Sequence, residues 1–133
     1  MICRIGGKIH KTTKKYIVEV ELNSGLFYEV QTTSDLWSSL DDGTRDYFPC
    51  TVIYREESQK MYGFDDQSEK DFFNLLIKTD GIGATMAITM LQEADQSFIV
   101  DAIISEDIIS LSSLKGIGKK TAEKIIQKLK KKV

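Results

Sequence analysis

Two short glycine motifs are the residues of this chain best suited to chemistry, and that chemistry is the binding of an anion. Gly116-Ile117-Gly118 lies between two apolar helical runs, and Gly81-Ile82-Gly83 repeats the arrangement upstream. Glycine reaches positive φ at little steric cost, so each motif can form a tight turn between two helices. The first N–H groups of the following helix have no intrahelical partner and can hold a phosphate oxygen. Two such turns predict a protein that binds a nucleic-acid backbone at two points without reading its bases.

Both motifs also have an ordinary structural explanation, because a glycine often ends a helix as its C-cap. The recurrence of the spacing weakens this explanation. Lys119 and Lys120 weaken it further, since cations in the first turn of a helix oppose its dipole unless an anion is near. The second motif is not a nucleotide-binding P-loop, because Ser113 stands where that loop needs glycine and Lys120 where it needs serine or threonine. We therefore expect phosphate binding without nucleotide hydrolysis.

Positive charge is concentrated around the second motif. The whole chain has a formal net charge of −2, which alone argues against a nucleic-acid partner. Between residues 65 and 114, however, acidic residues far outnumber the two lysines, Lys70 and Lys78. From Lys115 onward, lysines far outnumber the single acidic residue, Glu123. This uneven distribution is typical of a local phosphate-binding surface.

Length and composition are those of a globular protein. The 133 residues are enough for one ordinary domain or two small ones, with 41% hydrophobic and 29% charged residues. No apolar run approaches the roughly 20 residues of a membrane span, and the N-terminus lacks the apolar core of a signal peptide. Cys3 and Cys50 form no paired motif and are expected to be buried, reduced thiols of a cytoplasmic protein. His10 has no clustered ligand partners, so we expect no zinc site.

The chain is predicted to have a β half followed by an α half, with the change near residues 63–68. Alternation of apolar and polar residues at the end of 16–22, and the turn residues 23–25 after it, predict a hairpin with a second strand at 26–31. Further strands are expected at 2–9, 48–54 and 60–64, the last two separated by the turn residues 55–59. Short strands in this number favour a small closed or partly open barrel. Helical runs follow at 72–77, 84–91, 98–104, 105–111 and from residue 119. Ser68, Ser97 and Ser105 are expected to cap helices in this half.

Two further features have competing explanations. The lysine-rich last helix could lie on anionic lipid, but its apolar stripe has no aromatic anchor, so we expect it to pack against the second glycine motif. Glu56 and Glu57 lie in a turn between two strands, where a solvated polar turn is the simpler explanation. They do not indicate a carboxylate hydrolase, because nothing in the chain offers a metal or a base to work with them.

Several segments together resemble the bacterial Holliday-junction-binding RuvA family. They are the opening Met1–Gly7, the segment Gly25–Val30, the acidic turn Arg55–Glu57 with Tyr62–Phe64 after it, and two helix-hairpin-helix motifs at Leu76–Gly83 and Gly116–Glu123. The resemblance spans the chain. It implies an α+β fold in which an N-terminal OB-fold β-barrel at residues 1–64 precedes an all-α domain with tandem helix-hairpin-helix motifs at residues 65–133. It also implies a non-catalytic subunit that binds four-way junction DNA during branch migration, in recombination, DNA repair and the SOS response.

The resemblance implies roles for individual residues. The DNA-binding residues of the first hairpin would be Lys78, Thr79, Gly81, Gly83 and Thr85. Those of the second would be Gly116, Gly118, Lys119, Lys120 and Lys124. Glu56 and Glu57 would form an acidic pin at the junction centre, where they repel phosphates and guide the strands apart. No catalytic residue, metal or cofactor is implied.

The resemblance also implies partners. It implies a homotetramer, or an octamer, that holds the junction open, together with the RuvB ATPase as motor and the RuvC resolvase. Family members continue beyond the second hairpin into a further helical domain that docks RuvB, so a chain ending at Val133 is expected to bind junctions without recruiting the motor. Two departures from the family bear on binding: Ala84-Thr85 lacks a frequent lysine, which should weaken the first hairpin, and Lys115 replaces a common proline.

Two other functions remain open from the sequence. One is a general DNA-binding module, built from the same barrel and hairpins, with no preference for four-way junctions. The other is an enzyme, such as a hairpin-containing glycosylase or nuclease. The sequence offers no candidate catalytic residues for the second, and equal affinity for linear and four-way DNA would favour the first.

Overall fold

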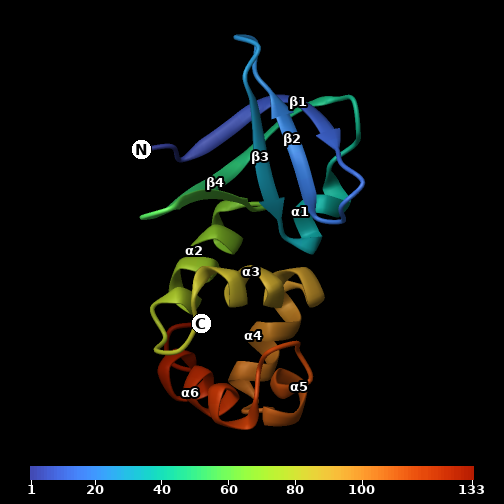
Figure 1. Ribbon diagram of the computed structural model, residues 1–133. Coiled ribbons are helices and arrows are strands. Elements are labelled where there is room, and N and C mark those ends of the chain that lie inside the picture. The colour runs from blue at the N-terminus through green and yellow to red at the C-terminus, as the bar shows by residue number, and fades with distance from the viewer. The chain divides into compact units, whose positions relative to one another are not determined.

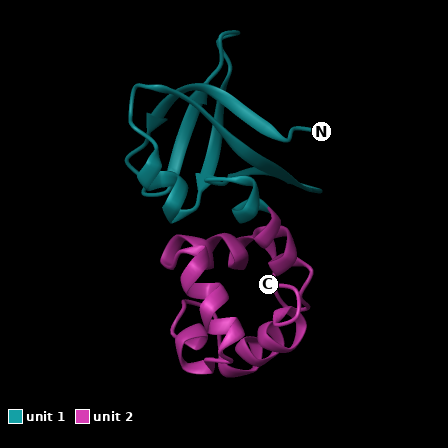
Figure 2. Cartoon of the chain, turned by 180° about the vertical axis from the view of Figure 1, so that it is seen from behind, with its two compact units in different colours: residues 1–70 teal, residues 71–133 magenta.

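The computed structural model describes residues 1–133, and the chain divides into two compact units, Met1–Lys70 and Asp71–Val133 (Figure 2). The last strand of the first unit ends at Gly63, and the division falls inside a helix that begins at Gln67. The domain boundary predicted between residues 64 and 65 therefore lies between the end of that strand and the start of that helix. Each unit is described by itself below.

The first unit is a closed five-stranded barrel (Figure 1). Its elements are β1 (Arg4–Lys11), β2 (Ile17–Glu21), β3 (Phe27–Thr32), α1 (Ser34–Ser39), β4 (Arg45–Arg55) and β5 (Ser58–Gly63). The strands follow the order β1-β2-β3-β5-β4, with every pair antiparallel except β3 and β5. A five-stranded barrel of this kind is the OB-fold. The predicted fold class is therefore confirmed.

Alternation along the strands builds the barrel core, because successive side chains of a strand point to opposite faces. Ile5 and Ile9 of β1 are buried, as are Val18 and Val20 of β2. The helix α1 adds Leu36, which is 2% exposed. Apolar side chains of all five strands thus meet inside the barrel.

The backbone packs so tightly in this barrel that two glycines have no room for a side chain. A Cβ at Gly7 would lie 2.3 Å from the carbonyl oxygen of Glu21, and a Cβ at Gly63 would lie 2.5 Å from the ring of Phe48. These glycines are required by packing within the chain. They provide a contrast for the glycines of the helical unit.

The two cysteines differ in burial. Cys50 lies in the barrel core, and burial raises the pKa of its thiol. Cys3 is exposed, so the expectation that both thiols are buried was wrong for this residue. Cys3 is in phase with the inward-facing residues of β1, and its carbonyl accepts from the Cys50 N–H at 3.0 Å, but it precedes the strand and lies beyond the part of it that fills the core.

The second unit is built from helices joined by short turns (Figure 1). They are α2 (Gln67–Ile77), α3 (Ala84–Glu93), α4 (Gln96–Ile104), α5 (Ile108–Ser112) and α6 (Lys119–Leu129). α4, α5 and α6 pack on one another. The helix α6 contributes Ala122, Ile125, Ile126 and Leu129 to the core. None of the helices combines the length and the apolar character that crossing a membrane requires.

Aspartates cap three of these helices where serines were expected. Asp66 accepts from the N–H of Glu69 at the start of α2, Asp95 caps α4 through the N–H of Phe98, and Asp107 caps α5. The predicted caps at Ser97 and Ser105 were wrong. A carboxylate near a helix N-terminus also interacts favourably with the helix dipole, which a serine hydroxyl does not match.

Candidate nucleic-acid interface

The two glycine motifs form turns of the same geometry. In the first, Thr79 N–H donates to the Leu76 carbonyl at 3.0 Å, and Ile82 N–H donates to the Thr79 carbonyl at 3.0 Å. Gly81 has a φ of 87°, which an L side chain adopts only with strain. These bonds close a tight turn between α2 and α3.

The second turn repeats this pattern between α5 and α6. Ile117 N–H donates to the Leu114 carbonyl at 3.1 Å, and Gly116 has a φ of 82°. Ile117 and its counterpart Ile82 are each 4% exposed. In both turns the apolar residue is therefore buried and anchors the turn, and the glycines on either side of it are exposed.

The helix that leaves each turn begins on a glycine that offers no cap. Gly83 precedes α3 with φ −93° and ψ 178°, Gly118 precedes α6 with φ −87° and ψ 176°, and neither helix start has a side-chain cap hydrogen bond. The four other helices each have a Thr or Asp side chain accepting from their first turn. The uncapped N–H groups at the start of α3 and α6 thus remain available to an anion from outside the chain.

Nothing inside the chain requires glycine at these two helix starts. Their φ values are ordinary for any residue, and a Cβ at Gly83 or Gly118 would have no heavy atom within 4 Å. This is the opposite of Gly7 and Gly63 in the barrel. Serine or aspartate would cap the helices better. Glycine at these two positions leaves open space beside the first main-chain N–H groups of each helix.

Charge around the two hairpins is unequal. Lys119 and Lys120 are exposed in the first turn of α6, and Lys124 is exposed one turn later. The first turn of α3 carries no charged residue, and Thr85 is its exposed polar side chain. The second hairpin therefore has a much stronger field for an anion than the first.

The remaining predicted residues of the first hairpin lie in different surroundings. Lys78 is exposed, whereas Thr79 is 3% exposed and its hydroxyl oxygen has no hydrogen-bond partner. Thr79 occupies the position that Leu114 holds in the second turn. Its carbonyl closes the turn, so it shapes the site through its backbone and does not present its side chain at the surface.

The two hairpins face a common hollow of about 520 Å³. It is lined by Gly83, Thr85, Met86, Thr89, Lys115 and Gly116. The main-chain N–H of Lys115 donates to a carboxylate oxygen of Glu93 at 2.7 Å. Glu93 is the last residue of α3. A single helix therefore carries the open N-terminus of the first hairpin and holds the turn of the second.

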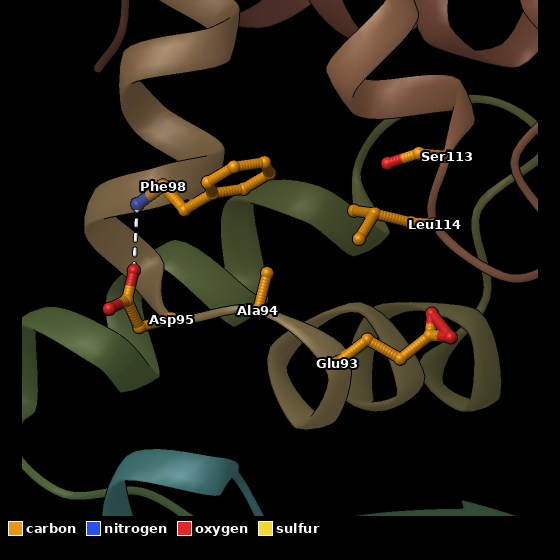
Figure 3. A pocket seen from close by; sticks show the side chains of 6 residues that line it. All are labelled: Glu93, Ala94, Asp95, Phe98, Ser113 and Leu114. Carbon is orange, nitrogen blue, oxygen red and sulfur yellow. Dashed lines mark hydrogen bonds between the residues drawn. The ribbon is translucent and has the colours of Figure 1, made fainter.

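Glu93 also lines a second hollow, of about 450 Å³ (Figure 3). It is lined by Glu93, Ala94, Asp95, Phe98, Ser113 and Leu114. Figure 3 shows the Glu93 side chain extending away from Asp95, on the side of Leu114. Both carboxylates accept main-chain hydrogen bonds, from Lys115 and Phe98 respectively. They act as structural acceptors and do not form a converging acid–base pair.

Glu56 and Glu57 form the two-residue connection between β4 and β5, which ends on the pair Arg55 and Ser58. Both glutamates are exposed. They therefore present two carboxylates at the tip of a hairpin of the barrel unit.

The most perturbed carboxyl group lies away from both hairpins. Glu69 is 2% exposed, and one of its oxygens accepts from the Thr33 hydroxyl at 2.6 Å and from the Asp65 N–H at 2.8 Å. Burial raises the pKa of Glu69 to about 7, although both hydrogen bonds act in the opposite direction. This group joins the caps of α1 and α2 within the barrel unit. No group of three or more His, Cys, Asp and Glu is placed to hold a metal ion.

Sequence reasoning missed the contribution of Glu93. A glutamate at the end of a helix has no local signature, and its contact with Lys115 joins residues 22 apart in the sequence. The one usable signal is the repeat that relates Gly81 to Gly116. It implies that the two hairpins pack as a pair, but it does not identify the side chain that joins them.

The fold and the site define a class of protein: an OB-fold barrel followed by a tandem of helix-hairpin-helix motifs with exposed, uncapped helix starts. Residues 73–131 match the family described as SAM-like helix-hairpin-helix tandem. Relatives of this chain from three bacteria, among others, bear the name Holliday junction branch migration complex subunit RuvA. The relative from Flavobacterium psychrophilum is 38% identical over 135 residues, and the match takes in 100% of this chain and 68% of the relative.

The other two relatives match at similar levels. The one from Christiangramia forsetii is 34% identical, with 100% of this chain and 68% of the relative covered. The one from Geobacter metallireducens is 35% identical, with 100% and 66% covered. The chain thus spans about two thirds of the length of these relatives. It belongs to the family of the Holliday junction branch migration complex subunit RuvA.

Proposed function

We propose that this chain binds four-way DNA junctions as the non-catalytic subunit of a branch migration complex, within recombination and DNA repair. The observation that carries the proposal is the pair of glycine helix starts, Gly83 and Gly118, which no packing or backbone strain within the chain requires. They leave the N–H groups of α3 and α6 open to phosphate. The names of the family members supply the kind of DNA.

Each hairpin is proposed to hold one stretch of sugar–phosphate backbone. In the first hairpin the contacts come from Gly81, Gly83 and Thr85, with Lys78 nearby and Thr79 shaping the turn. In the second they come from Gly116 and Gly118, with charge added by Lys119, Lys120 and Lys124. Main-chain donors and lysines contact phosphates without reading bases, so binding is expected to be independent of sequence and to weaken steeply with salt.

Junction preference is proposed to come from several copies acting together. The family implies a homotetramer, or an octamer, in which each copy holds one arm of an open junction. Linked sites bind far more tightly than single ones when their spacing matches the target. Glu56 and Glu57 are proposed as the acidic pin near the crossover, where exposed carboxylates repel phosphates that continue straight through. The RuvB motor and the RuvC resolvase are the further partners that family membership suggests.

The test compares a labelled four-way junction with a linear duplex of equal length, by fluorescence anisotropy at several salt concentrations. We expect tighter binding to the junction, and at least about tenfold weaker binding for Gly118→Ala, because the loss of one or two charge-assisted hydrogen bonds costs about 1.5–3 kcal/mol. Gln127→Ala, an exposed change on the same helix, is the control. Mass measurement with and without the junction reports the number of 15.1 kDa copies.

One alternative has direct support from the site, because backbone-only contacts serve any duplex equally well. It is a general DNA-binding module without junction preference. The same experiment separates the two. Equal affinity for the junction and the linear duplex, with Gly118→Ala weakening both, would establish the general module in place of the junction-binding subunit.

A further inference from the structure

The first hairpin has an open helix start but lacks a cation in the first turn of its helix. The first turn of α3 contains Ala84, Thr85 and Met86, whereas that of α6 contains Lys119 and Lys120. A phosphate at α3 would meet N–H groups and a hydroxyl, but no positive charge from that helix. A charge-assisted hydrogen bond is about twice as strong as a neutral one. The two hairpins would then bind DNA very unequally.

A lysine of the second hairpin is the candidate for this charge. Lys115 lines the same hollow as Gly83 and Thr85. It is exposed, and neither of the two ion pairs in the chain involves it. Its ammonium group is therefore free to meet an anion that enters the hollow from solvent.

One hydrogen bond ties the main chain of Lys115 to α3. The main-chain N–H of Lys115 donates to Glu93 at 2.7 Å, and Glu93 ends the helix whose N-terminus begins at Gly83. This bond uses the backbone of Lys115 and leaves its side chain unengaged. A proline at this position would have no N–H to donate. The lysine thus provides both the anchor for the turn and a free cation.

We infer that Lys115 supplies the cation for a DNA phosphate bound at the start of α3, so that the second hairpin completes the binding site of the first. This inference rests on the proposed function, since it concerns the same DNA backbone. In this arrangement the two hairpins form one continuous two-point site with the shared hollow between them. The alternative is that Lys115 serves the phosphate of its own hairpin at Gly118.

Double-mutant cycles distinguish these two assignments. The single variants are Lys115→Gln, which keeps the N–H bonded to Glu93, and the two helix-start variants Gly83→Ala and Gly118→Ala, which have free space for the new Cβ. Each is measured with the four-way junction by anisotropy over a salt series. Lys128→Gln, an exposed change in the last turn of α6, is the matched control. Thermal melting verifies that every variant is folded.

We expect Lys115→Gln to raise the Kd about 3- to 10-fold and to reduce the slope of log K against log salt by about 0.9 for each bound protomer. We also expect Lys115→Gln to have little further effect in the Gly83→Ala background and its full effect in the Gly118→Ala background, because only coupled residues are non-additive. Lys115→Arg keeps the charge and is expected to bind nearly as the wild type does.

Two results would overturn the inference. One is a Kd for Lys115→Gln no different from that of Lys128→Gln. The other is coupling to Gly118→Ala with additivity toward Gly83→Ala, which would assign Lys115 to its own hairpin. The proposed function fails differently: in that case neither helix-start variant changes binding, whatever Lys115→Gln does.

Discussion

Gly118→Asp is expected to make the protein more stable and its DNA binding weaker. In the structure the start of α6 has no side-chain cap, and a Cβ at residue 118 would meet no heavy atom within 4 Å. Aspartate is among the best N-cap residues, and its charge complements the helix dipole. It would occupy the same N–H groups that are proposed to hold a phosphate. One substitution therefore turns an anion site into an ordinary capped helix.

The two effects have opposite signs and sizes that can be measured. An added cap and a favourable charge contribute about 0.5–1 kcal/mol to stability, which raises Tm by roughly 2–6 °C for a domain of this size. Loss of charge-assisted bonds to phosphate costs about 1.5–3 kcal/mol, and repulsion between the carboxylate and a phosphate adds about 1 kcal/mol. Junction affinity should therefore fall about 100-fold or more.

The assay combines thermal melting with anisotropy on a four-way junction at fixed salt. Gln127→Glu places the same added charge on an exposed position of α6, near the far end of the helix from the hairpin, and should leave affinity nearly unchanged. A Gly118→Asp protein that melts higher yet binds the junction as tightly as the wild type would refute the reasoning. It would mean that the start of α6 is open in the structure for some reason other than DNA.

Three further predictions concern other parts of the molecule. Changing Glu56 and Glu57 to Gln should raise affinity for linear duplex about 3- to 10-fold, because the carboxylates no longer repel phosphates. If the ratio of duplex to junction affinity does not change, the two glutamates are ordinary surface residues. Gly116→Ala should cost about 1 kcal/mol of stability, because the φ of Gly116 is 82° and an L side chain is strained there. Gly118→Ala should have a Tm close to that of the wild type. Equal Tm values for the two variants would contradict the turn geometry. The pKa of Glu69 is raised to about 7, so the folded state binds a proton that the unfolded state releases above about pH 4.5. The free energy of unfolding should therefore fall as pH rises from about 4.5 to about 7, by at most about 3 kcal/mol. Glu69→Gln should remove this loss. Urea unfolding measured across this pH range tests the prediction, and the same pH dependence in the variant and the wild type would contradict it.

Local patterns predicted most of the elements, because those elements have local causes. Alternation in one segment and turn residues between the others predicted all five strands, and the positive φ of Gly81 and Gly116 agrees with the expected tight turns. The strand bounds differ by a few residues. β4 begins at Arg45, three residues before the predicted start, because its pairing with β1 continues past the apolar run to Lys8.

What could not be predicted depends on contacts between distant residues. The helix α1, six residues long, is too short for a helical period, and burial of Leu36 in the barrel defines it. The parallel pairing of β3 with β5 closes the barrel, yet neither strand carries a local sign of it. In the candidate site, the glycines and lysines were visible in the sequence. The bond between Glu93 and Lys115 was not, because it depends on how the second hairpin packs against the first.

The composition of the site limits where any preference for junctions can arise. The exposed groups of the two hairpins that can contact DNA are main-chain N–H groups, hydroxyls and lysines, with the carboxylate of Asp80 exposed beside them. Such donors contact phosphates of every sequence alike. A single chain with a net charge of −2 also has little general attraction for DNA. One copy should therefore bind any duplex weakly and with little discrimination. Under the proposed function, selectivity for a four-way junction is expected to come from the spacing of several copies, each engaging one arm, and from the repulsion of phosphates by Glu56 and Glu57. Monomeric protein at high dilution should then lose its junction preference before it loses DNA binding altogether.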